Sequence, residues 1–161
     1  MAIPRTYCVV FLFCVAAVIV SPAQGVYFTS MVSFDWTNGG YPWSGLVLGA
    51  DGNFYGTTAG GGAYPEGCPN TSLNGCGTVF KISPAGQLTP LYDFCSLPYC
   101  EDGAIPYGQL IQASDGNLYG TTWQGGINHP NGCGGAGCGY GTVFKITTTG
   151  VLTMCCNQAI A

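Results

Sequence analysis

Few residues in this 161-residue chain have the types and spacing that metal binding requires. Two Asp-Gly-Asn segments, which begin at Asp51 and Asp115, offer oxygen ligands of the kind that Ca²⁺ prefers. A calcium loop of the EF type also needs several more carboxylates at alternate positions and a distal Glu, which neither segment has. We therefore expect each Asp side chain to cap its own turn, and we predict no metal site.

Covalent and acid–base catalysis are equally poorly supported. The threonine pairs Thr57–Thr58 and Thr121–Thr122 would need a base within hydrogen-bond reach, and the single histidine, His129, lies in one loop of the chain. Glu101 and Asp102 are adjacent in what we expect to be a surface loop, which does not suit the two opposed carboxyl groups of a glycosidase. The sequence therefore predicts no catalytic residue and no cofactor.

Aromatic side chains are the best candidates for contact with a partner. Flat aromatic rings suit sugar rings and protein hot spots. The alternative is that they pack between neighbouring sheets. We expect the partner to be a carbohydrate or a surface protein, and five candidate contact residues fall at predicted strand ends or in loops: Trp36, Tyr41, Trp43, Tyr107 and Trp123.

The cysteines form local couples in Gly-, Pro- and Asn-rich loops. In an exported chain such couples are typical of short disulfide loops, whereas a zinc site would want a C-x2-C spacing or nearby histidines. Cys155 and Cys156 have no obvious partner. The predicted disulfides are Cys68–Cys76, Cys95–Cys100 and Cys133–Cys138.

The N-terminus has the features of a secretory signal peptide. Arg5 supplies the positive charge, Tyr7 to Val20 is apolar, and small residues surround a cleavage site after Ala23. The apolar stretch is shorter than the roughly 20 residues of a membrane-spanning helix, and nothing later is long enough to span. Seven carboxylates against three Lys and Arg give a net charge of −4 and exclude nucleic acid as a partner. We predict a secreted or cell-surface protein.

An internal repeat sets the architecture. Asp51 to Thr58 (DGNFYGTT) returns as Asp115 to Thr122 (DGNLYGTT), and Gly77 to Ile82 returns unchanged as Gly141 to Ile146, each 64 residues further on. Repeats of this size indicate units that bury their apolar faces against one another. The predicted segments are a signal peptide (1–23), a fourth-type strand and linker (24–40), unit 1 (41–94), a cysteine loop (95–104), unit 2 (105–153) and an irregular tail (154–161).

Each unit reads as four antiparallel strands. In unit 1 they are expected at 44–50, 53–58, 78–83 and 87–94, with a type I′ turn at Asp51-Gly52 and a turn at Pro84-Ala85-Gly86. No helical periodicity follows the signal segment. The fold class is therefore all-β, with two four-stranded blades of the β-propeller type after an N-terminal signal helix.

The blades do not make a closed ring by themselves. Residues 29–34 align with 89–94, so the chain opens with a fourth-type strand that has no first three. Two units are too few for a ring of about 4–8 blades. We expect either a fragment of a longer propeller or blades that assemble between chains, and uncovered faces that promote self-association.

The repeated motif carries a family resemblance. The pattern P-x-x-x-L-[VI]-x-[GA]-x-D-G-N-[FL]-Y-G-T-T-x-x-G-G followed by G-T-V-F-K-I-[ST]-x-x-G-x-L-T, found between Thr29 and Thr153, resembles the choice-of-anchor GloVer tandem repeats. The resemblance implies an exported repeat protein with no activity to transfer. We therefore expect a non-catalytic structural, adhesive or ligand-binding module. The alternative is a remnant of a propeller enzyme of the lactonase or lyase type without its site residues.

Overall fold

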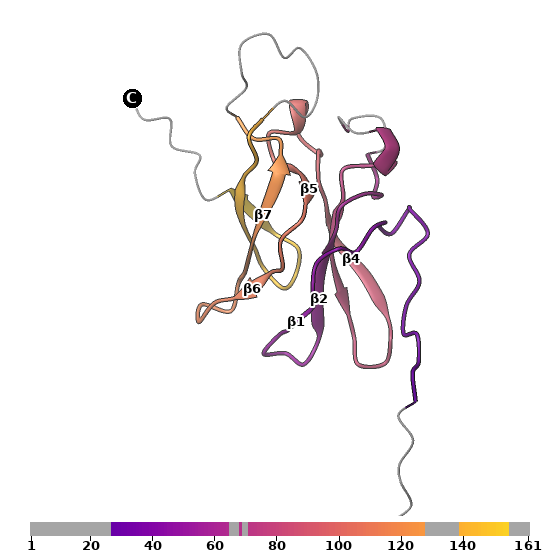
Figure 1. Cartoon of the computed structure of the whole chain (residues 1–161). Helices are drawn as coiled ribbons and strands as arrows, with labels where there is room; N and C mark the ends of the chain where they lie inside the picture. Colours follow the sequence, from indigo (N-terminus) through magenta and orange to yellow (C-terminus); the bar gives the residue numbers. More distant parts are fainter. Residues whose placement is uncertain (1–26, 65–67, 69–70, 128–138, 155–161) are drawn as a thin grey trace, which may run out of the picture.

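The computed structural model describes residues 27–64, 68, 71–127 and 139–154, which form two antiparallel sheets side by side (Figure 1). The first sheet has the order β1 (Val47–Leu48), β2 (Phe54–Thr58), β3 (Thr78–Ile82) and β4 (Leu88–Asp93). The second has the order β5 (Ala104–Pro106), β7 (Leu118–Gln124), β8 (Val143–Ile146) and β9 (Leu152–Met154), and β6 (Ile111–Gln112) also pairs with β7. The 3₁₀ helices η1 (Thr71–Leu73) and η2 (Pro98–Cys100) lie in the loops.

The all-β fold with two propeller-like blades is thus confirmed. The predicted signal helix lies outside the described residues, as do His129, Cys133, Cys138, Cys155 and Cys156. Across the described ranges, no helix has the length and apolar character needed to cross a membrane.

The two sheets repeat each other in register. Val47 pairs with Tyr55 in unit 1, and Ile111 pairs with Tyr119 in unit 2. The second sheet has one strand more than predicted, because β5 pairs with the far end of β7. Its counterpart in unit 1 is a single bridge between Gly40 and Gly60.

The hairpin turn differs from the predicted type I′. Gly49 N donates to Asn53 O at 2.8 Å and Gly52 N donates to Gly49 O at 2.9 Å, which closes a three-residue loop. A type I′ turn needs positive φ at both central residues, but only Gly52 of the Asp-Gly pair has it, at 80°. The same pair of hydrogen bonds closes the loops at 83–87, 113–117 and 147–151.

The core lies within and between the sheets. Tyr55 and Val79 are fully buried on the face of unit 1 that unit 2 covers, and Thr57 on the same face lies 3.5 Å from the carbonyl oxygen of Gly108. Phe94 of unit 1 packs edge-on against Phe144 of unit 2. The units therefore share one core, as expected of repeats that cannot bury their faces alone.

Residues 29–34 occupy the position of a preceding fourth strand without being one. Phe34 packs on Phe80 as Phe94 packs on Phe144. The backbone of Met31 lies beside Gly86, at 3.3 Å from a Cβ added there, just as the backbone of Leu91 lies beside Gly150. The predicted strand is wrong in its secondary structure, because this segment has no ladder partner among the described residues.

Candidate functional site

The five aromatic residues singled out from the sequence form one continuous series of ring contacts, which we call the aromatic band. Tyr41 and Trp43 are stacked with centroids 5.2 Å apart, and Trp43 and Tyr107 are stacked at 4.8 Å. Trp36 meets Tyr41 edge to face at 5.0 Å, and Trp123 meets Tyr107 edge to face at 5.8 Å. The aromatic band therefore crosses the boundary between the units.

All five rings of the aromatic band lie at the surface, but they differ in how much of each is exposed to solvent. Their residues are 39–56% exposed, and Trp123 is the most exposed. Trp43 has stacked neighbours on both sides, so it presents mainly its edge to solvent. Trp36 packs over Gly40, where a Cβ would lie 2.5 Å from its ring. Trp123, at one end of the band, is consequently the best placed for contact with a ligand.

The two Asp-Gly-Asn loops hold their own hairpins, as predicted. Asp51 accepts hydrogen bonds from Tyr55 OH at 2.7 Å and from Asn53 Nδ2 at 2.8 Å. These bonds lower the pKa of the Asp51 carboxyl, and burial raises the pKa of the Tyr55 hydroxyl. Asp115 makes the same contacts with Asn117 and Tyr119, and these hydrogen bonds, that from Asn117 most of all, lower the pKa of its carboxyl. The carboxylate oxygens are thus used in turn closure.

The threonine pairs also have structural contacts. The Thr58 and Thr78 hydroxyls are 2.9 Å apart across β2 and β3, and Thr58 also donates to Gly60 O at 2.9 Å. Thr122 and Thr142 repeat this arrangement in unit 2, also at 2.9 Å. These cross-strand pairs tie the ends of the sheets together, as pairs of threonines do in antiparallel ladders.

Asp102 corrects the expectation of an exposed acidic loop. It is fully buried, and its Oδ2 accepts from Tyr92 OH at 2.8 Å, Ser96 N at 2.9 Å and Ser96 Oγ at 2.8 Å. A buried carboxylate needs such donors because desolvation disfavours its charged form. The disulfide Cys95–Cys100 closes the same loop. Asp102 is therefore the anchor of the cysteine loop.

Cys68 and Cys76 are brought together as predicted, but as a pair of buried thiols in hydrogen-bond contact. The pKa of the Cys76 thiol is raised, mainly by this hydrogen bond and secondly by burial. The Cys76 sulfur also lies within 4.8 Å of both sulfurs of the Cys95–Cys100 disulfide. A disulfide between Cys68 and Cys76 stays a prediction, as does Cys133–Cys138, which lies outside the described residues.

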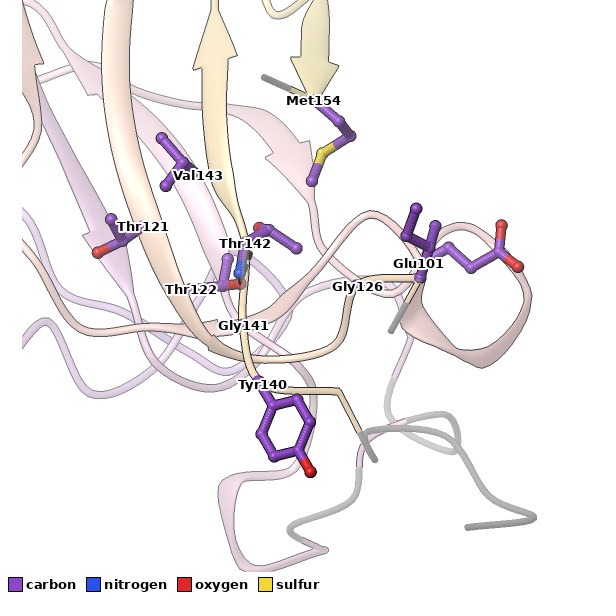
Figure 2. Close-up of a pocket in the computed structure, with 10 residues that line it drawn as sticks. Glu101, Thr121, Thr122, Gly126, Tyr140, Gly141, Thr142, Val143 and Met154 are labelled. Atoms are coloured by element: carbon purple, nitrogen blue, oxygen red, sulfur yellow. Dashed lines mark hydrogen bonds between the residues drawn. The ribbon is translucent and has the colours of Figure 1, made fainter. Parts of the chain in front are cut away.

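A hollow on unit 2 was not predicted from the sequence (Figure 2). It has a volume of about 390 Å³, and its centre is formed by Thr121, Thr142 and Val143, with Glu101 and Met154 on its rim. The hollow could have been predicted from the repeat. Its residues are the counterparts of unit 1 residues that unit 2 covers, and no third unit follows in the described structure to cover them. Figure 2 shows the Tyr140 ring directed away from Thr121 and Val143.

Residues 17–158, which include both units and their shared core, match the Gloeobacter/Verrucomicrobia repeat. The chain belongs to this family. The match confirms the resemblance indicated by the repeated DGN-x-YGTT and GTVFKI motifs. A comparison of this Gloeobacter/Verrucomicrobia repeat protein with curated proteins finds no match.

Proposed function

We propose that this chain is a non-catalytic, exported repeat module whose aromatic band binds carbohydrate. The observation that carries the proposal is the continuous ring series from Trp36 to Trp123, which stays 39–56% exposed although it spans two units. Aromatic surfaces of this kind bury the apolar faces of sugar rings at little entropic cost. Among the described groups that could do chemistry, Asp51, Thr58 and Asp102 make structural hydrogen bonds.

The net charge of the protein narrows the class of carbohydrate that we expect it to bind. A net charge of −4 disfavours uronate-rich or sulfated polysaccharides, because like charges repel at the surface. A neutral glycan meets no such penalty. We therefore propose a neutral polysaccharide, with Trp123 as the main contact and the Trp43–Tyr107 stack as its support.

Affinity electrophoresis in gels containing a neutral soluble β-glucan tests this function, with a sulfated glycan as the charged comparison. Trp123→Ala should abolish retardation in the β-glucan gel. Tyr64→Ala is the matched control, because Tyr64 is 42% exposed and lies outside the aromatic band. Equal retardation of Trp123→Ala and the unsubstituted chain would reject the carbohydrate site. Retention by a surface protein and not by glycans would favour a protein partner.

Export is part of the same proposal. The disulfide Cys95–Cys100 is typical of oxidising compartments, and it agrees with the signal-peptide pattern of the sequence. The N-terminus of material recovered from the medium should begin near Gln24. A chain that keeps Met1 and stays with the cells would contradict this step.

A further inference from the structure

The junction between the units contains a docking segment and a socket. The docking segment is the start of unit 2: Ile105 N donates to Cys76 O of unit 1 at 2.8 Å, and both Ile105 and Pro106 are buried. Pro106 lies over Gly77, where a Cβ would be 2.8 Å from the proline Cδ. An Ile-Pro pair thus fills the socket of unit 1.

The hollow on unit 2 is the same socket without its occupant. Val143 is 48% exposed, whereas its counterpart Val79 is fully buried. Thr121 is exposed, whereas Thr57 is 1% exposed. Because the units share sequence and register, the difference comes from the neighbour that covers unit 1. The shape of the hollow is therefore that of a repeat-binding surface (Figure 2).

Unit 1 carries the matching docking segment in an uncovered state. Tyr41-Pro42 lies 64 residues before Ile105-Pro106 in the sequence. Pro42 is exposed, whereas its counterpart Pro106 is buried. Tyr41 and Ile105 share a left-handed backbone, with φ of 56° and 58°, so the segment is preformed. Leu46 is 47% exposed, whereas its counterpart Leu110 is 1% exposed.

We infer that the hollow on unit 2 receives the Tyr41-Pro42 segment of a second copy of this chain. The interface reproduces the docking contacts between the two units: by equivalence with Ile105 N to Cys76 O and Pro106 over Gly77, Tyr41 N of one copy would donate to Tyr140 O of the other and Pro42 would lie over Gly141. The fourth-strand contact on Phe80 is supplied within the second copy by its own Phe34. This contact is head-to-tail, so it adds copies until the rotation closes a ring or leaves an open filament. A ring of about 4–8 blades would need two to four copies.

Two charged substitutions test the inference, one on each side of the interface. Val143→Arg blocks the socket, Pro42→Arg blocks the docking segment, and Leu97→Arg is the control, since Leu97 is 47% exposed on the cysteine loop. Sedimentation velocity over a concentration series should show oligomers for the unsubstituted chain and for Leu97→Arg. Each interface variant alone should associate at least tenfold more weakly, and its unfolding midpoint should equal that of the unsubstituted chain at a concentration where both are monomeric.

A mixture of the two interface variants gives the decisive result. Each has one intact surface, so Val143→Arg and Pro42→Arg together should form a one-to-one complex. A monomeric unsubstituted chain, unaltered association of both variants, or a mixture that stays monomeric while the unsubstituted chain assembles would each overturn the inference. If an interface variant does not fold, competition by a synthetic peptide of residues 39–44 replaces it, and failure of the peptide to weaken assembly contradicts the proposal.

Discussion

Phe94 and Phe144 meet edge to face across the unit boundary, with ring centroids 5.1 Å apart and an interplanar angle of 64°. Phe34 and Phe80 meet at the same distance and angle. The end of each fourth-type segment therefore packs on the third strand of the following unit. This contact is a repeated element of the interface between units.

Phe144→Ala should strongly destabilise the fold, because Phe144 is fully buried at this contact. We expect a loss of about 3–5 kcal/mol in the free energy of unfolding, measured by chemical denaturation. Phe34→Ala removes a half-buried ring and should cost about 1.5 kcal/mol or less. Equal losses for the two variants would contradict a core that is centred between the units.

Asp102→Ala should also be costly, because it leaves Tyr92 OH, Ser96 N and Ser96 Oγ without their buried acceptor. The expected loss is more than about 2 kcal/mol by thermal or chemical unfolding. Its neighbour Glu101, which is partly exposed, is the control, and Glu101→Gln should change stability by less than about 0.5 kcal/mol. A neutral effect of Asp102→Ala would show that the cysteine loop does not depend on this carboxylate.

Acid should weaken the hairpins. Hydrogen bonds lower the pKa of Asp51 and Asp115 in the folded state, so their contribution is present above the unfolded value of about 3.9 and is lost as pH falls through the folded values. Burial raises the pKa of Asp93, so its protonation acts in the opposite direction. In unfolding titrations between pH 7 and 2, replacing both loop carboxylates by Asn should flatten the decline. An unchanged slope would contradict the role of these carboxylates.

The buried thiols should be protected. The raised pKa of Cys76 keeps it protonated at pH 8, and the thiolate is the reactive form, so alkylation of the folded, reduced protein should be much slower than after unfolding.

The oxidised protein should contain three local disulfides. Peptide mapping of secreted protein without reduction should find Cys68–Cys76, Cys95–Cys100 and Cys133–Cys138. A link from Cys76 to Cys95 or Cys100, whose sulfurs lie within 4.8 Å of the Cys76 sulfur, would reject this pairing.

The sequence was sufficient for the features that depend on local pattern. The DGN-x-YGTT repeat predicted the strands of the two units, whereas the strand predicted at residues 29–34 is absent. The turn type was missed because Ala50 belongs to the loop, which a two-residue Asp-Gly pattern does not reveal. The burial of Asp102 was missed because its donors come partly from β4, and the contact depends on how the cysteine loop folds back.

The order of the elements along the chain also sets an order of folding. The socket of unit 1 is complete once β4 has formed, and the segment that fills it, Ala104–Pro106, follows directly after the cysteine loop. A chain that emerges N-terminus first therefore exposes the strands of unit 1 before the segment that covers them is synthesised. The connection from β4 to β5 spans residues 94–103, so the docking segment is near unit 1 in the sequence as well as in space.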